Sequence, residues 1–456
     1  MRRHFHIQQT RLDIAPEQAW LLLKDPQTFS RLAPPWLPVR CEPVPKSIEE
    51  GSTFTVHISS GVLRGSWQAR VTALRRGFLI GFELLSPRAR KWVIWTKLLP
   101  TDSPHSCILE ERIEFTDSAL LGKTKSRLEK AIRRVVYHRH RTLKSDLQVL
   151  TSPQQVSPQR ILIAGGTGLV GRNLIPLLRS RGHKVFLLST RESERPATLF
   201  WDPSSGRIDS TALEGMDTVI NLAGSTIATR WTRKTRKRIL DSRIQSAHLL
   251  VKHLLRLDQP PRQLIQASAV GFYGFHQKLG VTEEGTRGEG FLAEVCEQWE
   301  AELKPLQGSA IQTTIARLGV VLTPEAGALA KMLPAFRLGI AGRLGNGKQP
   351  FAWISIHDLV RALTFLVEKP ELTGIFNLCT PHPPSNAAFT KELARTLGRP
   401  AVLPVPGLAL RLLMGAMANE ALLGGIGAEP VALSDAGFRF EDASLDEALP
   451  LLLGRS

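Results

Sequence analysis

A glycine-rich segment directly behind a short apolar run constrains this chain more than any other feature. Residues 161–171 read ILIAGGTGLVG, with glycines at positions 165, 168 and 171. The first glycine permits a tight strand-to-helix turn, the next lets the backbone approach a pyrophosphate, and the last allows close packing of the helix on the strand. Free N–H groups at the start of the helix then face the anion. The segment predicts the dinucleotide-binding turn of a Rossmann domain, with contacts from Gly165, Gly166, Thr167, Gly168, Leu169, Val170 and Gly171.

The end of the second strand indicates which dinucleotide binds. HKVFLLS (183–189) is followed by Thr190 and Arg191, and no acidic residue comes before Glu192. NAD enzymes usually place an Asp or Glu here to bond the ribose 2′-hydroxyl. An arginine suits the 2′-phosphate of NADP(H), which an acid would repel. We therefore predict NADP(H) as the cofactor.

The order of expected elements divides the chain. After residue 160, strands and helices alternate, which is typical of a doubly wound parallel sheet of the α/β Rossmann class. The stretch TSPQQVSPQ (151–159) has the composition of a linker. We predict an N-terminal domain over 1–150, the linker over 151–159, a Rossmann domain over 160–402 and a small C-terminal substrate lobe over 403–456.

The N-terminal part predicts an α+β domain. A strand, a helix from Pro16, several further strands and a long helix with apolar residues at helical spacing follow one another. The order resembles the START-like (SRPBCC, polyketide-cyclase-like) helix-grip superfamily over Phe5 to Leu150, and this resemblance implies a cavity for an apolar molecule. Aromatic side chains either line that cavity or fill the core: Trp67, Phe82, Trp92 and Trp95.

Several segments of the second part resemble one family closely. GGTGLVG, STR, NLAG (221–224), RILDSRI (238–244), SAVGFYG (268–274) and LGNGKQPFAWISIHDLV (344–360) are similar to the atypical "epimerase family" branch of extended short-chain dehydrogenases/reductases. The stretch from Pro404 to Leu453 resembles that family's small C-terminal domain of unknown function. The resemblance implies further cofactor contacts, with a solvated helix face as the alternative for the first two arginines: Arg238, Arg243, Arg317, Val321, Thr190, Arg191, Leu222, Ala223 and Gly224.

The usual catalytic pair of this superfamily is missing. A Tyr-x-x-x-Lys pair normally exchanges the proton with the substrate oxygen. Aligning the expected helix on Glu300 places Leu292 and Cys296 at these two positions. Two interpretations stay open: Ser268 or Tyr273 serves in catalysis, or the substrate or a water supplies the proton and both residues are structural.

Composition restricts partners and compartment. The net charge of +18 is spread along the chain and accompanies no nucleic-acid-binding motif, so we expect no nucleic-acid partner. The four cysteines are scattered, which argues against a disulfide framework or a metal site and favours a reducing compartment. We find no signal peptide and no apolar run long enough to span a membrane, and we expect a cytoplasmic protein.

Three functions fit these observations. The first is an NADP(H)-dependent oxidoreductase or epimerase-like enzyme acting on an unknown, apolar small molecule. The second is a catalytically degenerate NADP(H)-binding or sensing protein, and the third is a carrier of an apolar ligand. The sequence does not identify the substrate or the oligomeric state.

Overall fold

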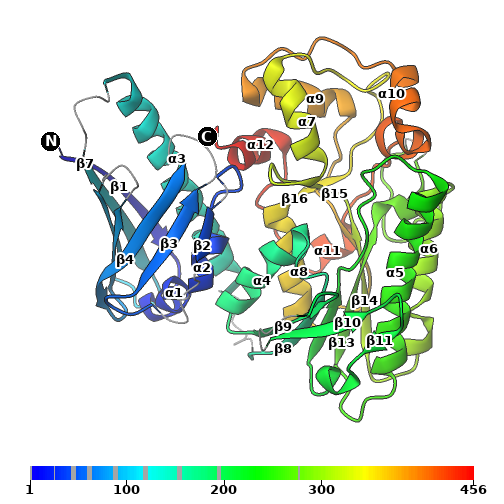
Figure 1. The fold of residues 1–456 in the computed structure, drawn as a ribbon, viewed down its shortest axis with the longest axis horizontal. Coiled ribbons are helices and arrows are strands. Elements are labelled where there is room, and N and C mark those ends of the chain that lie inside the picture. Colours follow the sequence, from blue (N-terminus) through cyan, green and yellow to red (C-terminus); the bar gives the residue numbers. More distant parts are fainter. Residues whose placement is uncertain are drawn as a thin grey trace. The chain divides into compact units, whose positions relative to one another are not determined.

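The computed structural model divides the chain into two compact units (Figure 1). It describes residues 3–24, 26–37, 39–42, 48–58, 64–85, 91–116, 122–150, 157–192, 197–275 and 278–455. The first unit comprises Met1–Gln155 with Arg179–Arg181 and Leu451–Ser456, and the second comprises Val156–Leu178 and Gly182–Pro450. Most of the predicted linker, residues 151–156, lies outside the described residues.

The first unit is a seven-stranded antiparallel sheet with one long helix. Its strands lie in the order β1-β7-β6-β5-β4-β3-β2, and every neighbouring pair is antiparallel. The several strands and the long helix predicted from the sequence are confirmed, and the strands form an antiparallel sheet; β2 was not predicted from the sequence. The elements are β1 (Arg3–Leu12), α1 (Pro16–Leu23), α2 (Pro26–Arg31), β2 (Val39–Glu42), β3 (Thr53–Ile58), β4 (Gly65–Arg75), β5 (Leu79–Leu85), β6 (Lys91–Pro100), β7 (Cys107–Thr116) and α3 (Gly122–Leu150).

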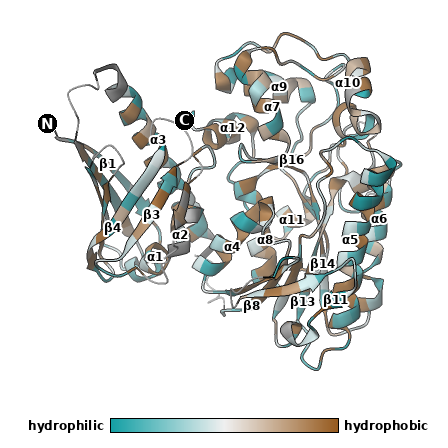
Figure 2. Cartoon of the chain, viewed as in Figure 1, coloured by the Kyte–Doolittle hydropathy of each residue, from teal (hydrophilic) through white to brown (hydrophobic). Residues whose placement is uncertain are grey.

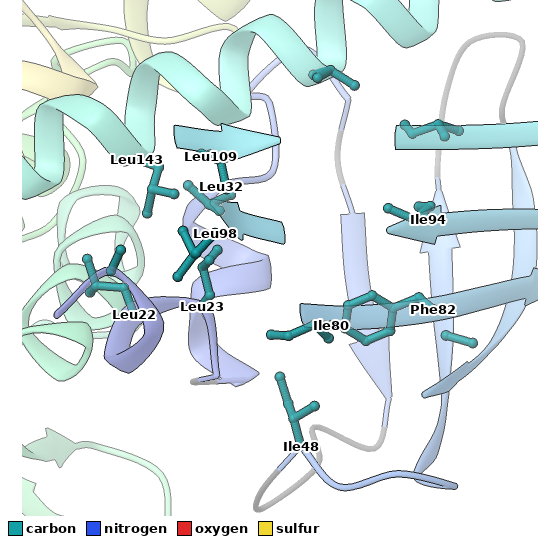
Figure 3. Packing of buried hydrophobic residues seen from close by; sticks show 14 of the residues in the cluster. Leu22, Leu23, Leu32, Ile48, Ile80, Phe82, Ile94, Leu98, Leu109 and Leu143 are labelled. Carbon is teal, nitrogen blue, oxygen red and sulfur yellow. The ribbon is translucent and has the colours of Figure 1, made fainter. Parts of the chain in front are cut away.

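The helix α3 and one face of the sheet share a hydrophobic core (Figure 3). Strand β6 alternates along its length, so that Trp92 and Ile94 are buried while Trp95 lies on the other face. From α3, an apolar stripe at helical spacing enters the same core. Its members are Leu128, Ile132, Val136, Leu143 and Leu147.

The second unit contains an eight-stranded, mostly parallel sheet in the order β11-β10-β9-β8-β12-β13-β14-β17. From β8 the chain adds strands toward one edge of the sheet (β9, β10), and from β12 it adds them toward the other edge (β13, β14). This change of direction leaves a crevice at the carboxyl ends of β8 and β12. Strand β12 is buried throughout, as expected for a strand covered on both faces. The elements are β8 (Arg160–Ala164), α4 (Leu169–Ser180), β9 (Lys184–Ser189), β10 (Thr198–Asp202), β11 (Arg207–Ile208), β12 (Thr218–Asn221), α5 (Arg233–Leu254), β13 (Gln263–Ala269), α6 (Phe291–Ala301), β14 (Gln312–Leu318) and β17 (Gly374–Leu378).

A second group of elements completes this unit. A two-stranded parallel pair, β15 and β16, leads into the buried helix α8. Figure 2 shows the parallel strands largely in brown, whereas the helices carry both hydrophobic and hydrophilic residues. No helix within the described ranges is long and apolar enough to cross a membrane. The remaining elements are β15 (Val320–Leu322), α7 (Gly327–Leu338), β16 (Trp353–Ser355), α8 (Ile356–Glu368), α9 (Asn386–Leu397), α10 (Gly407–Met414), a π-helical turn (Ala418–Leu423), α11 (Val431–Asp435) and α12 (Leu445–Leu453).

Candidate cofactor and substrate site

The glycine loop between β8 and α4 has the close backbone contacts that its sequence predicts. Gly165 adopts a φ of +80°, and a Cβ there would lie 2.7 Å from the backbone of Leu222. A Cβ on Gly171 would lie 2.5 Å from the Cα of Gly166, so the helix could not start this close to the loop with any other residue. Thr167 and Gly168 are exposed at the start of α4. The loop therefore presents open backbone at a helix N-terminus, where an anion binds favourably.

The end of β9 carries an exposed cationic side chain. Thr190 and Arg191 are exposed, and the backbone N–H of Arg191 donates to the Ser189 hydroxyl at 3.0 Å. The Arg191 guanidinium forms no ion pair with any described residue. In contrast, Arg172, just after the last glycine, pairs with Glu325 at 2.7 Å. Among the described residues, Arg172 is paired with an acid and Arg191 is not, so Arg191 is the better candidate for an anion contact on this side of the loop.

The end of β12 is held in place by side-chain hydrogen bonds. The Asn221 amide donates to Gln266 at 3.0 Å, and its oxygen accepts the N–H of Ala223 at 3.1 Å. A Cβ on Gly224 would lie 3.1 Å from the guanidinium carbon of Arg243. Small residues at this turn therefore leave room both for the glycine loop and for Arg243.

The two arginines of α5 have different surroundings. Arg238 is exposed to solvent. Arg243 donates to the carbonyls of Ser225 and Ile239 at 3.0 Å each and lies 5.1 Å over the Trp299 ring, and burial lowers its pKa. Only Arg243 thus faces the interior of the site.

A cavity of about 190 Å³ lies at the carboxyl ends of the parallel strands. It joins residues of the glycine-loop helix, the ends of β12, β13 and β14, and helices α5 and α6. Leu292 and Cys296, one helical turn apart on α6, both face it, so the positions of the missing Tyr and Lys are occupied by a hydrocarbon and a thiol. The lining residues are Val170, Leu222, Ile227, Arg243, Ala267, Ser268, Ala269, Leu292, Val295, Cys296, Trp299 and Leu318.

Ser268 connects this cavity to a buried ion pair. Its hydroxyl donates to Oε1 of Glu300 at 2.6 Å, and the same oxygen accepts Nε–H of Arg317 at 2.9 Å. A second bond from Arg317 reaches the other carboxylate oxygen at 2.7 Å. The guanidinium also lies 3.5 Å from the centre of the Phe272 ring. Glu300 is therefore fixed by a bidentate contact, and it orients the serine hydroxyl at the cavity wall.

Tyr273 is held outside the cavity wall. Its hydroxyl donates to Oδ1 of Asn377 at 2.8 Å, and its ring packs in a separate cluster with Val281 and Ile426. Burial raises the pKa of this phenol. The structure thus brings Ser268 to the cavity and keeps Tyr273 apart from it, which favours the structural interpretation of the tyrosine.

Two more predicted positions have defined places. The thiol of Cys296 is buried and its pKa is raised to about 11 by burial and the charge of Glu300, so it stays protonated at neutral pH. Val321, on β15, lies near the first turn of α7, where a Cβ on Gly327 would approach both its carbonyl and Leu169. Arg317 bonds Glu300 through Nε and Nη2, whereas its buried Nη1 has no hydrogen-bond partner among the described residues. A contact of this residue with a cofactor stays a prediction.

Sequence reasoning missed three partners in this site. Glu300 served only to align a motif, although it is the residue that joins Ser268 to Arg317. Trp299, which stacks on Arg243, was not singled out. Glu420 accepts the N–H groups of both Phe291 and Leu292 at 3.0 Å and so caps α6 from far along the chain. A lone glutamate on an amphipathic segment carries no sequence signal for such a contact.

The first unit contains a cavity of its own, of about 150 Å³. Its wall is apolar except for Arg139. Phe82 and Trp92 line it, whereas Trp67 packs edge-on against Trp92 at 5.0 Å and Trp95 points to the other face of the sheet. In the described part of the chain, no cluster of His, Cys, Asp or Glu is suited to a metal ion.

Comparison with protein families identifies the second unit. Residues 161–379 match the NAD dependent epimerase/dehydratase family, and residues 405–450 match a domain of unknown function, DUF1731. An epimerase family protein of Mycobacterium bovis is 41% identical over 290 residues, covering 63% of this chain and 96% of the relative. The human epimerase family protein SDR39U1 is 32% identical over 294 residues, covering 64% of this chain and 98% of the relative.

Solved structures extend the comparison. A nucleoside-diphosphate sugar epimerase from Corynebacterium glutamicum is 25% identical, with a TM-score of 0.79, and covers 98% of this chain and 90% of its own. That match includes the N-terminal antiparallel domain as well. Human SDR39U1, solved with NADPH, is 32% identical with a TM-score of 0.59 over 64% of this chain and 99% of its own.

Proposed function

This chain belongs to the epimerase family of NAD(P)-binding proteins, and from this premise we propose that it is an NADP(H)-dependent oxidoreductase or epimerase-like enzyme acting on an apolar small molecule. The observation that carries the proposal is the cavity at the strand ends. Its wall is apolar apart from Arg243, Cys296 and the oriented hydroxyl of Ser268, and the helix that follows the glycine loop borders it. These are the parts that hydride transfer to a carbonyl requires near a nicotinamide.

The residues around the loop fit a phosphorylated dinucleotide. The backbone of 165–171 would hold the pyrophosphate, because Gly165 and Gly171 have no room for a side chain and the start of α4 is open to the anion. The exposed guanidinium of Arg191, next to Thr190, would bind the 2′-phosphate. Leu222, Ala223 and Gly224 would contact the adenosine side, with Arg243 and Val321 nearby. A relative solved with NADPH supports this choice of cofactor.

Ser268 is the group we propose to hold the reacting oxygen of the substrate. Its hydroxyl reaches the cavity and Glu300 fixes its orientation. A water or the substrate itself would supply the proton, because Leu292 has none to give and burial with the charge of Glu300 disfavours the thiolate that Cys296 would leave behind. When NADPH is bound, it provides the hydride. Because Leu292 and Cys296 replace the usual catalytic Tyr and Lys, one alternative function is a binding protein that senses NADP(H) without turnover.

For the N-terminal unit we propose a START-like helix-grip domain over residues 1–150 that holds an apolar ligand. Support comes from the shared core of α3 and the sheet and from the apolar cavity lined by Phe82 and Trp92. A linker over 151–159, a Rossmann domain over 160–402 and a substrate lobe over 403–456 complete the proposed organisation. Four free cysteines agree with a reducing compartment such as the cytoplasm.

A titration with NADPH and NADH tests the cofactor assignment. We expect NADPH to bind more tightly, and Arg191→Glu to lower NADPH affinity about tenfold to a hundredfold with little effect on NADH, because a charge-assisted contact to the 2′-phosphate is lost. Nicotinamide fluorescence reports binding. Arg256→Glu, an exposed arginine near the end of α5, is the matched control for net charge.

Turnover then separates enzyme from sensor. Steady NADPH oxidation with one member of a panel of apolar aldehydes and ketones supports the enzyme. Tight NADPH binding with no oxidation across the panel supports the sensing protein instead. If neither nucleotide binds at millimolar concentration, about −4 kcal/mol, both assignments are wrong.

A further inference from the structure

The most exposed large apolar side chains of the described residues gather in one region of the second unit. Val402, Leu338, Leu412 and Leu408 have exposed fractions of 75%, 73%, 70% and 67%, the four highest values among large hydrophobic residues there. Ile340 and Leu403 are also more than half exposed. We call these six residues the lobe patch: Leu338, Ile340, Val402, Leu403, Leu408 and Leu412.

The segments that carry the lobe patch are neighbours. Residues 338–345 leave α7 and run beside 400–407, with a parallel bridge between Leu344 and Val405 and a hydrogen bond of 2.9 Å from the Val405 N–H to the Arg343 carbonyl. Helix α10 follows at once, near the same end of the unit as α7 and α9 (Figure 1).

Helix α10 presents two of its leucines, Leu408 and Leu412, to the outside. Leu408 and Leu412 lie one turn apart, so they share a face. Leu410 is buried, and Arg411 is exposed beside the two leucines. Figure 2 draws much of this helix in brown. An apolar group of this size on the surface marks an interaction site.

The surroundings of the lobe patch are strongly basic. Residues 327–348 and 386–423, all of them described, contain eight basic residues and two acidic ones. Glu420 caps α6, and Glu392 pairs with Arg395 at 2.6 Å, so this acid and this arginine offset each other. Arg395 also lies near Asp446, and the excess of positive charge comes from the other basic residues. The basic residues are Lys331, Arg337, Arg343, Lys348, Lys391, Arg395, Arg399 and Arg411.

We propose that the lobe patch docks this protein on the surface of an anionic lipid bilayer. The leucines would enter the boundary between headgroups and acyl chains, and the long basic side chains would reach the lipid phosphates. Both kinds of contact can form at once, since a bilayer surface offers an apolar acyl-chain region directly below negatively charged headgroups.

The same two features disfavour other occupants. A second copy bound through its own lobe patch would bring two basic surfaces together, which repel. A nucleic acid would neutralise the arginines but would bury few of the leucines, because its outer surface is phosphate and sugar. Of these three occupants, the bilayer surface is the one that would contact both the exposed leucines and the basic side chains.

Vesicle co-sedimentation of the full chain tests the proposal. We expect binding to vesicles of phosphatidylcholine with phosphatidylserine, weaker binding at high salt, and little binding to phosphatidylcholine alone. The double substitution Leu408→Ser with Leu412→Ser keeps the net charge and should lower binding at least about tenfold. Leu255→Ser, an exposed leucine at the end of α5, is the matched control and should leave binding unchanged.

Three results would overturn the proposal. One is equal binding of the double variant and the wild type to phosphatidylserine vesicles, which would assign the attraction to general charge. Another is binding to duplex DNA without binding to vesicles. The third is a wild type that sediments as a dimer together with a double variant that sediments as a monomer, because the patch would then be covered by a second copy. Circular dichroism of each variant confirms that the fold is intact.

Discussion

At the scale of single residues, the contact between Ser268, Glu300 and Arg317 decides what the cavity can do. Ser268 belongs to β13, Glu300 to α6 and Arg317 to β14, so three elements must pack correctly before the hydroxyl is oriented. The carboxylate is largely buried, and its cation is 2% exposed. Removing one partner of such a pair leaves an uncompensated charge in the interior.

We predict that Ser268→Ala and Glu300→Ala differ sharply in stability. Glu300→Ala should lower the free energy of unfolding by about 3–5 kcal/mol, because Arg317 stays buried without its carboxylate. Ser268→Ala removes one hydrogen bond and should cost about 1 kcal/mol. Denaturant unfolding followed by circular dichroism measures both.

For Ser268→Ala we expect a large loss of turnover, although the loss of stability is small. With an active carbonyl substrate from the panel, Ser268→Ala should lower kcat about a hundredfold while NADPH affinity stays the same, since only a contact to the reacting oxygen is lost. Ser246→Ala, a buried serine that donates to the Arg243 carbonyl, is the control and should keep kcat. An unchanged kcat in Ser268→Ala would assign the serine to structure alone.

At the scale of elements, helix α8 anchors the C-terminal segment through one carboxylate. Asp358, in its first turn, is completely buried and accepts N–H groups of Glu441 at 3.1 Å and Asp442 at 2.8 Å, while Arg361 pairs with it at 2.7 Å. Burial and the nearby charge of Asp442 raise the pKa of Asp358. The sequence suggested only a first-turn acid, and the structure adds a contact over 83 residues of chain.

We predict that Asp358→Ala lowers the free energy of unfolding by about 3–5 kcal/mol, because Arg361 and two backbone N–H groups lose their acceptor. Asp358→Asn should cost less, since the amide oxygen still accepts hydrogen bonds. Asp435→Ala, on the exposed side of α11, should change stability by less than about 0.5 kcal/mol. Similar melting temperatures for the Asp358→Ala and Asp435→Ala proteins would contradict the anchoring role.

At the scale of the whole molecule, the sequence predicted the parts whose signal is local. The glycine loop, the parallel sheet and the amphipathic α3 each follow from neighbouring residues. Strand β2 was missed because VRCE is short and lies between prolines. The pairing of Glu300 with Arg317 and the cap on α6 were missed because their partners are distant in sequence, and a single chain gives no sign of which distant polar groups meet.

One buried histidine makes the stability of the first unit depend on pH. In the first unit, His140 is buried, bonded to Thr10 at 2.9 Å, and burial with the charges of Arg139 and His6 lowers its pKa to about 3. An unfolded chain protonates this imidazole below about pH 6.5. Its contribution to stability is therefore complete above pH 6.5 and is lost as the pH falls toward 3.

We predict that His140→Gln flattens this dependence. The wild-type unfolding free energy should fall relative to the variant by about 1 kcal/mol per pH unit between pH 6 and 4. Glu111, whose pKa is raised by burial, titrates in both proteins and cancels in the comparison. Parallel pH profiles of wild type and variant would show that His140 is not the responsible group.

The cap that Glu420 provides for α6 has a consequence for whether the Rossmann domain and the C-terminal domain can occur separately in a gene. Helix α6 forms one wall of the cavity, yet its first two N–H groups depend on a carboxylate from the C-terminal domain. The Asn377 amide and Asp358 likewise depend on backbone groups of residues 429–442. A gene that lost its last 50 codons would therefore encode a nucleotide-binding core whose helix α6, one wall of the cavity, lacks its cap. We expect the nucleotide-binding core and the C-terminal domain to be gained and lost together in evolution.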